Sequence, residues 1–157
     1  MENIVVRKAR VGDVDNIQKI ISEMADKGLM LTRSKYRVVT MLTNFFVAEF
    51  DGKFAGCGAF YPLWTDLGEV MSLAVAPCCQ GKGVGKKLVE TIVNEGRGLG
   101  FPAMITLTYQ VDFFKKLGFK VTNKDKFPRK VWRECLECPK LENCDETAMV
   151  LNLRKEI

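Results

Sequence analysis

The chain has 157 residues, of which 47% are hydrophobic and 27% charged, and its net charge is +5. This length suits one domain over residues 1–157 with one substantial core, and the basic residues are dispersed rather than gathered into a nucleic-acid-binding patch. Histidine is absent, which excludes Ser-His-Asp and Cys-His hydrolases, histidine-ligated zinc and an imidazole base.

The amino-terminal residues lack the basic and apolar regions of a signal peptide, and no apolar run is as long as a bilayer-spanning helix. We therefore expect a cytoplasmic protein with neither a membrane nor a nucleic acid as a partner. The six cysteines are expected to be free thiols or ligands, because a thiol in the cytosol is normally reduced.

The beginning of the chain predicts a strand and two helices. Residues 4–10 form a short β-branched run, as expected for a strand. Apolar residues recur at helical spacing from about residue 13 to about residue 27, which predicts a helix with its apolar face in the core. A shorter helix is expected from Ser34, as its N-cap, to about Leu42.

A hairpin and a third strand are expected next. Asp51-Gly52 separates two apolar runs, 45–50 and 53–61, and this dipeptide is the strongest short-range signal of a hairpin. Two glycines inside the second run indicate a bulge or a close approach to a ligand. The run from Glu69 to Val75 then completes an antiparallel meander.

A glycine-rich turn follows this meander. The strand ends at Pro77, three glycines lie between residues 81 and 85, and residues 84–99 have helical periodicity. Such a turn lets backbone N–H groups converge on an anion, the helix start adds a partial positive charge, and three lysines lie nearby. Neither the Walker pattern nor the dinucleotide fingerprint is met. We therefore expect a phosphate-binding loop of another kind.

The second half continues with a strand at 103–108. A strand, a crossover helix and another strand of these lengths favour a parallel pair. The remaining elements are expected as a helix at 111–117 and strands at 119–121 and 147–153, with a charged, irregular stretch over 124–145.

The loop and its flanks resemble the acetyl-CoA pyrophosphate loop of the GCN5-related N-acetyltransferase (GNAT) superfamily. The family pattern Q/R-x-x-G-x-G/A is matched by Gln80 to Gly85, and the preceding L-A-V-x-P by Leu73 to Pro77. Phe113 to Phe119 resembles the second motif of the same superfamily. The resemblance implies acetyl-CoA as cosubstrate and an α/β (α+β) fold, with a mixed, mostly antiparallel sheet flanked by helices and a parallel pair splayed at the acetyl-CoA site. The alternative is that these glycines serve only as turn residues.

By this resemblance, the backbone of the strand before the loop pairs with the pantetheine arm of acetyl-CoA. A backbone N–H in that strand would polarise the thioester carbonyl. The residues expected to contact acetyl-CoA are Leu73, Ala74, Val75, Gln80, Gly81, Lys82, Gly83, Val84, Gly85, Lys86 and Phe114.

Transfer of an acetyl group to an amine needs a base for the ammonium proton and a proton for the departing thiolate. Glu69 is the candidate base, acting through water; the alternative is a surface carboxylate. Phe114 stands where many superfamily members have the tyrosine that protonates the thiolate, and phenylalanine cannot donate. Tyr109 is the candidate substitute; the alternatives are a core or rim tyrosine and a thiolate that leaves without a dedicated acid.

Within the superfamily, the sequence resembles the short, free-standing N-acetylglutamate synthases. The likeness is carried by Leu31–Ser34, Gly56–Pro62, Glu69, Ser72–Val75, Thr106–Tyr109, Phe113–Phe119, Lys130–Trp132, Cys138–Lys140 and Cys144–Glu146. It implies acetylation of the α-amino group of L-glutamate, the first step of arginine biosynthesis. It also implies a short form without the amino-acid-kinase domain of the longer synthases and without arginine inhibition through that domain.

Glutamate carries two carboxylates that need cationic anchors, and arginine offers a planar, bidentate fork. The resemblance implies that Arg33 holds one carboxylate, with Lys130 or Arg7 near the other. It also implies that Cys57 and Ser72 line the acceptor pocket. The alternative for Lys130 is a solvated loop lysine.

A cysteine cluster and three other functions stay open. Cys135, Cys138 and Cys144 have a spacing that zinc or an iron-sulfur centre could use, but structural zinc takes four ligands and only three are local. We therefore expect no metal and a loop packed by its own thiols, with a fourth ligand from elsewhere as the alternative. The other functions are acetylation of another small amine or of a protein amine, an acyl-CoA sensor without turnover, and a metal-dependent interaction module. A homodimer is also left open.

Overall fold

The computed structural model describes residues 3–123 and 146–154. In that part of the chain, one sheet of seven strands has the order β1-β2-β3-β4-β5-β7-β6, and β4 and β5 are its only parallel neighbours. The strands are β1 (Ile4–Lys8), β2 (Phe45–Phe50), β3 (Lys53–Trp64), β4 (Leu67–Val75), β5 (Ala103–Thr108), β6 (Lys120–Val121) and β7 (Thr147–Asn152). This mixed, mostly antiparallel sheet confirms the predicted fold class.

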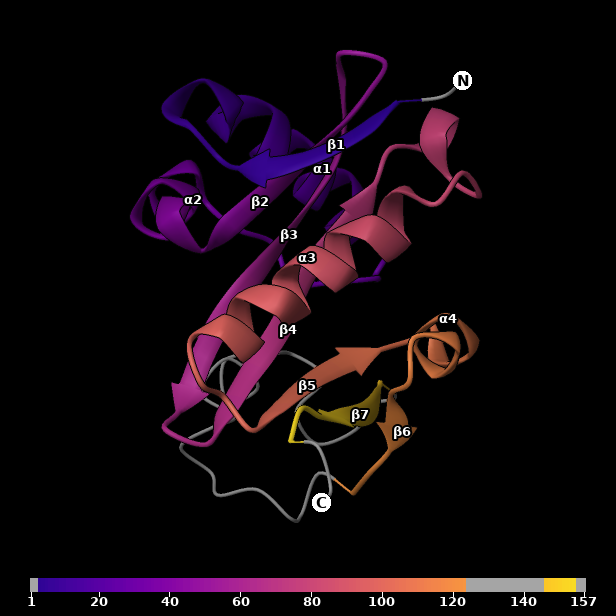
Figure 1. The fold of residues 1–157 in the computed structure, drawn as a ribbon. Helices are drawn as coiled ribbons and strands as arrows, with labels where there is room; N and C mark the ends of the chain where they lie inside the picture. Colours follow the sequence, from indigo (N-terminus) through magenta and orange to yellow (C-terminus); the bar gives the residue numbers. More distant parts are fainter. Residues whose placement is uncertain (1–2, 124–145, 155–157) are drawn as a thin grey trace.

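Helices cover the sheet and divide the core into two main apolar clusters (Figure 1). The helices are α1 (Val14–Asp26), α2 (Lys35–Thr40), α3 (Val84–Gly98) and α4 (Val111–Lys116). One cluster joins α3 and α4 to the sheet, and the other joins α1 and α2 to it. No helix in the described part of the chain is long and apolar enough to cross a membrane.

The predicted elements that fall on described residues are present, with small shifts at their ends. The first long helix begins at Val14, directly after a short 3₁₀ turn (Val11–Asp13) in which the carboxylate of Asp13 accepts from the N–H of Arg10 at 2.7 Å. Ser34 is the N-cap of α2 and accepts from the N–H of Arg37 at 3.1 Å, as predicted. The stretch expected to be irregular lies almost wholly outside the described residues.

Arg7 joins β1, β2 and the start of α1. Its Nη1 and Nη2 donate to the two carboxylate oxygens of Asp13 at 2.8 and 2.9 Å, and its Nε donates to Glu49 at 2.9 Å. This guanidinium holds the pKa of Asp13 below its ordinary value. Two carboxylates of the fold thus bind Arg7, and it does not line the cavity described below, which disfavours the expectation that it lies near a substrate carboxylate.

The hairpin between β2 and β3 turns at Asp51 and Gly52, whose φ angles are +50° and +83°, as a two-residue turn with this dipeptide requires. Inside β3, a Cβ added at Gly56 would lie 2.5 Å from the carbonyl oxygen of Ala74 on β4. The glycine in this strand therefore permits a close approach of two backbones. The predicted bulge is present beside it, where the register with β2 skips Ala55, whereas the close approach to a ligand stays a prediction.

A bulge in β4 and a break in the β4–β5 pair shape the centre of the sheet. Ala74 and Met71 pair with Cys57 and Ala59, so two residues of β4, Ser72 and Leu73, face the single residue between that pair on β3. Ser72 has a φ of +54°, which is rare for a residue with a side chain.

The parallel pair is short. Its register contains only Gly68 with Met104 and Glu69 with Ile105. The hydroxyl of Thr106 donates to the carbonyl oxygen of Val70 at 3.0 Å in a buried hydrogen bond. Beyond this bond no ladder pair joins the two strands in residues 3–123, and they diverge (Figure 1). The predicted splayed parallel pair is therefore present.

Candidate functional site

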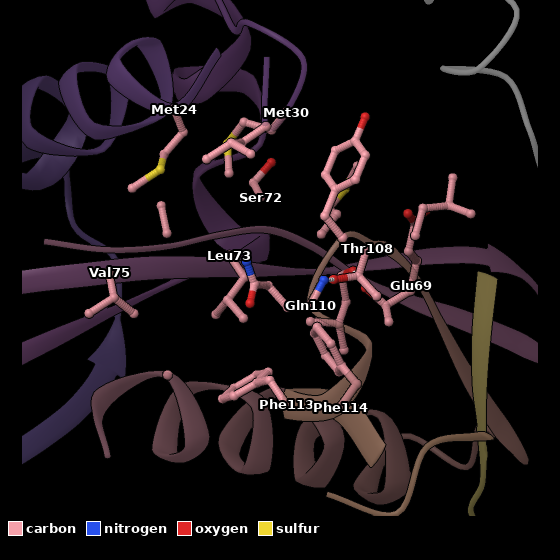
Figure 2. Close-up of a pocket in the computed structure, with 18 of the residues that line it drawn as sticks. Met24, Met30, Glu69, Ser72, Leu73, Val75, Thr108, Gln110, Phe113 and Phe114 are labelled. Atoms are coloured by element: carbon pink, nitrogen blue, oxygen red, sulfur yellow. Dashed lines mark hydrogen bonds between the residues drawn. The ribbon is translucent and has the colours of Figure 1, made fainter. Parts of the chain in front are cut away.

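A cavity of about 920 Å³ opens where β4 and β5 diverge. Its lining comes from β4, the end of β5 and the residues after it, the glycine-rich loop, the segment after α1, the end of β3, and α4. Figure 2 shows Met24, Met30 and Ser72 on one side of the cavity and Phe113 and Phe114 on the other, with Leu73 and Thr108 between them. Almost all of the sequence-predicted site residues that the structure describes converge on this one space.

The wall from β4 carries Glu69 and Ser72 to Val75, all of which line the cavity. The bulge sets its geometry, because Ser72 and Leu73 have no Cα partner on β3 or β5 in the observed register. The backbone groups of a strand without ladder partners can bond to a ligand instead. Pairing of this wall with the pantetheine arm stays a prediction.

The glycine-rich loop forms a second part of the lining through Gln80, Gly81, Gly83, Gly85 and Lys86. Gly81 and Gly83 have φ angles of +77° and +91°, which favour glycine. A Cβ at Gly85 would lie 3.3 Å from the Phe113 ring, so a larger residue there would crowd α4. The first N–H groups of α3 follow directly and have no partner within their own helix.

Two residues predicted in this loop do not line the cavity. Val84 is 1% exposed and packs in the core cluster beneath α3, because it begins the apolar face of that helix. The ammonium of Lys82 lies over the ring of Phe50, 5.0 Å from its centroid. Lys87 also turns away and donates to the carbonyl oxygen of Ile4 at 2.6 Å. Of the three loop lysines, Lys86 is the one in the cavity lining.

Candidate acid and base groups lie in the same cavity. Glu69 is half-buried on β4, opposite Tyr61 on β3 and Ile105 on β5, and Tyr109 follows the end of β5. Phe114 is 3% exposed and makes edge contacts with Phe113 and Phe119 at centroid distances of 5.0 and 5.1 Å. The ring that replaces the common tyrosine therefore belongs to the core as well as to the cavity wall.

Several polar residues of the lining, among them Thr108 and Glu146, were given no site role by the sequence reasoning. Thr108 is 7% exposed, and its hydroxyl accepts from the N–H of Gln110 at 2.7 Å. Glu146 lies just before β7 and adds a second carboxylate. The alternation of Thr106, Leu107 and Thr108 in β5 would have placed Thr108 on the same side as the buried Thr106. No local signal identifies Glu146, because its position depends on the pairing of β7 with β5.

The segment after α1 brings cationic and apolar side chains to the cavity. Lys27, Leu29, Met30, Leu31 and Arg33 line it, together with Met24 from the helix itself. Arg33 is half-buried and directly precedes Ser34, the N-cap of α2. The capping hydrogen bond therefore fixes the backbone next to Arg33.

Cys57 lies on β3, opposite Ala74 of β4, and does not line the cavity. Its side chain is fully buried in the α1 and α2 cluster, and its thiol donates to the carbonyl oxygen of Ser72 at 3.6 Å. Burial raises the pKa of this thiol to about 12. Contrary to the prediction, Cys57 is not in the cavity lining, because its side chain is buried in the α1 and α2 cluster, whereas Ser72 does line the cavity.

Several predicted residues fall outside the described part of the chain, namely Lys130, Cys135, Cys138 and Cys144. Within residues 3–123 and 146–154, no group of three or more cysteine, aspartate or glutamate side chains could hold a metal ion.

A model of the acetyltransferase (GNAT) family matches residues 22–119. An uncharacterized N-acetyltransferase of Chlorobaculum tepidum is 39% identical over 148 residues, which make up 94% of this chain and 96% of that protein. An amino-acid acetyltransferase of Mycobacterium tuberculosis is 36% identical over 118 residues, 73% of this chain and 67% of that protein.

Among solved structures, N-acetylglutamate synthase from Neisseria gonorrhoeae, complexed with coenzyme A and N-acetyl-glutamate, aligns with a TM-score of 0.87 at 26% identity. The alignment covers 98% of this chain and 36% of the synthase, so the chain spans about a third of that protein. A Mycobacterium tuberculosis protein solved with coenzyme A aligns with a TM-score of 0.83 at 29% identity, over 96% of this chain and 99% of that one.

Proposed function

We propose that this chain, which belongs to the acetyltransferase (GNAT) family, transfers the acetyl group of acetyl-CoA to the α-amino group of L-glutamate. The transferase class and acetyl-CoA as cosubstrate follow from the family and from relatives solved with coenzyme A. Glutamate as the acceptor, and with it a place in arginine biosynthesis, is the proposed part. The observation that carries it is one cavity whose lining combines the glycine-rich loop, the diverging strands and Arg33.

In this proposal the glycine-rich loop holds the pyrophosphate of acetyl-CoA. Hydrogen-bond donors come from the backbone N–H groups of Gln80 to Gly85, and the first turn of α3 adds more donors and a partial positive charge. Lys86 adds a full positive charge. The pantetheine arm runs along β4, where the bulge leaves Ser72 and Leu73 without ladder partners. The N–H of Leu73 is our candidate for the donor that polarises the thioester carbonyl.

The reaction then needs two proton transfers. Glu69, acting through a water molecule, accepts a proton from the substrate ammonium, and the free amine attacks the thioester carbonyl carbon. The C–S bond of the tetrahedral intermediate breaks, and the thiolate of coenzyme A takes a proton from a hydroxyl in the cavity. Tyr109 is our candidate donor, and Thr108 is the second hydroxyl at that end of β5.

Glutamate is favoured over a cationic acceptor by the side chains after α1. Arg33 can hold a carboxylate through two parallel N–H groups, and Lys27 adds a second positive charge to the same lining. A lysine-like acceptor would meet like charges there, whereas a dicarboxylate is attracted to both.

The test is release of coenzyme A thiol from acetyl-CoA, with L-glutamate compared in parallel with glutamine, aspartate, ornithine and lysine. Arg33→Lys keeps the charge but removes the fork, and we expect the KM for glutamate to rise by about 10- to 100-fold, the range for a lost bond to a charged group. The KM for acetyl-CoA should stay unchanged.

The matched control is Lys35→Ala, since Lys35 is exposed, is paired with Asp15 on the surface and lies outside the cavity lining. This variant should behave like the parent protein. Equal turnover of glutamate and ornithine, or an Arg33→Lys variant with an unchanged KM for glutamate, would contradict the proposed acceptor while leaving acetyl transfer intact. No thiol release with any amine would instead favour an acyl-CoA sensor.

A further inference from the structure

Two adjacent thiols stand at the entrance to the glycine-rich loop. Cys78 and Cys79 belong to the 3₁₀ turn Pro77–Cys79, between β4 and the loop, and their sulfur atoms are 3.2 Å apart. Cys78 is exposed, whereas Cys79 is 6% exposed and lines the cavity. The acetyl-transfer chemistry uses neither of them, so this dithiol needs a different explanation.

We propose that Cys78 and Cys79 form a thiol-modification site, at which low-molecular-weight disulfides convert the pair to a vicinal disulfide that weakens acetyl-CoA binding. The coupling to acetyl-CoA rests on the proposed role of the Gln80–Gly85 loop. The formation of the disulfide rests on the sulfur geometry alone.

The reaction proceeds in two exchange steps. The thiolate of Cys78 attacks one sulfur of a disulfide RSSR, an S–S bond to Cys78 forms, and RS⁻ leaves. Cys79 then loses its proton, its thiolate attacks the sulfur of Cys78, and a second RS⁻ leaves. In total two protein thiols are oxidised to one disulfide, RSSR is reduced to two thiols, and the two cysteine protons go to the departing thiolates through solvent.

The order of the two steps follows from exposure. Cys78 is accessible to a disulfide in solution, while Cys79 is buried in the core cluster beneath the loop. The pKa of Cys79 is also raised, first by its hydrogen bond with Cys78 and then by burial, so Cys79 is the poorer initial nucleophile. Once Cys78 is in a mixed disulfide, the neighbouring sulfur attacks within the same molecule, which favours closure over further exchange.

Closure must change the turn. Consecutive Cα atoms are about 3.8 Å apart, below the range of about 4.4–6.8 Å that disulfides usually span. The turn is held by the N–H of Cys79 to the carbonyl oxygen of Ala76 at 2.9 Å, and the next residue, Gln80, donates its side-chain amide to Val75 at 3.2 Å. A ring closed between the two cysteines therefore displaces the start of the loop that is proposed to hold pyrophosphate.

Binding and oxidation must then oppose each other. If the disulfide weakens acetyl-CoA binding, bound acetyl-CoA disfavours the disulfide by the same factor. A vicinal disulfide whose ring is strained is also readily reduced, so the modification is reversible.

The first experiment locates the bond. The full chain is incubated with oxidised glutathione, with and without acetyl-CoA, and cleaved after Glu69 and Lys82, which releases residues 70–82 with both cysteines and without Cys57. Mass spectrometry should find this peptide lighter by two hydrogens, and less of it when acetyl-CoA is present. Cys79→Ser should stop at a glutathione adduct on Cys78. A wild-type peptide that stays reduced, or that carries only the adduct, would overturn the proposal.

The second experiment measures acetyl-CoA binding by calorimetry. Acetyl-CoA is the right probe because its acylated sulfur cannot reduce the disulfide. We expect the Kd to rise by about tenfold or more on oxidation, equivalent to about 1.4 kcal/mol or more, and to return after reduction. The exposed Cys78→Ser variant should bind like the reduced parent and show no response to oxidised glutathione.

An unchanged Kd in protein that carries the disulfide would overturn the proposed coupling. No binding by the reduced protein would contradict the proposed function instead, and the mass measurement would still decide whether the disulfide forms.

Discussion

At the residue scale, the hydroxyls of Thr108 and Tyr109 at the end of β5 are the candidate proton donors, because Phe114 has no hydroxyl. The hydroxyl of Thr108 already accepts the N–H of Gln110, so its own hydrogen must point in another direction. Thr108 and Tyr109 both line the cavity, and Phe114 is fixed among aromatic rings. In the proposed mechanism, the proton for the departing thiolate therefore comes from this strand end rather than from the position of Phe114.

Tyr109→Phe tests this assignment. Loss of a positioned acid should lower kcat by about 10²- to 10⁴-fold while the Kd for acetyl-CoA changes little. Steady-state kinetics with calorimetry separates the two quantities. Thr108→Val and the conservative Thr108→Ser are the comparison variants. If Tyr109→Phe and Thr108→Ser keep the parent rate while Thr108→Val is slow, the proton donor is Thr108 and the assignment of Tyr109 is wrong.

Glu69→Gln tests the base. The amide cannot accept the ammonium proton, so we expect kcat to fall by about 10²- to 10⁴-fold at neutral pH. The deficit should shrink as the pH rises and more of the amine is already deprotonated. The measurement is the pH dependence of kcat/KM for parent and variant. A variant with the parent pH profile and rate would exclude Glu69 as the base.

At the element scale, the site depends on two departures from regular β structure. The bulge at Ser72 and Leu73 removes ladder partners from β4, and the short register with β5 lets the two strands separate. Next to the bulge, β3 and β4 are in close backbone contact at Gly56. The cavity thus depends on backbone geometry, and side chains such as Arg33 complete its lining.

Gly56→Ala should destabilise this part of the sheet. The added methyl would lie 2.5 Å from the carbonyl oxygen of Ala74, so the strands must shift, at a cost of about 1–3 kcal/mol in the free energy of unfolding. Urea unfolding of both proteins gives this difference. Gly98→Ala, at the exposed end of α3 with open space around it, is the control and should be neutral or stabilising by up to about 1 kcal/mol. Equal stability of parent and Gly56→Ala would refute the close approach.

At the scale of the whole molecule, the Arg7, Asp13 and Glu49 cluster ties the first strand and the first helix to the rest of the sheet. Glu49 lies on β2, so three elements meet at one guanidinium. The side chain of Arg7 is 24% exposed, and that of Asp13 is 12% exposed. The cluster is therefore a structural feature of the fold, separate from the cavity.

Stability should fall at acid pH through this cluster. The pKa of Asp13 in the folded protein is lowered from 3.8, chiefly by the hydrogen bonds from Arg7. The stabilisation is complete above pH 3.8 and is lost as the pH falls toward the lower folded value. Unfolding free energies measured over this range should fall more steeply for the parent than for Asp13→Asn. Parallel curves would show that the pair contributes no pH dependence.

The order and type of the elements were determined by the sequence itself. Periodic apolar residues predicted α1 and α3, Asp51-Gly52 predicted the hairpin, and the three glycines after Pro77 predicted the loop. These signals are local, because the backbone preference of a residue and the face of the helix or strand on which it lies depend on residues close to it in the sequence. That the whole chain is a single domain stays a prediction, as do the individual roles of the site residues.

Only the tertiary structure decided which side chains share the cavity. It buried Cys57 in the α1 and α2 core cluster, bound Arg7 to two carboxylates, turned Lys82 toward Phe50 and brought Thr108 and Glu146 to the lining. Each of these outcomes depends on strand register, a bulge or the partner of a charged group, all set by residues distant in the chain. A sequence pattern reports the face of an element, whereas the neighbours across that face are determined by packing.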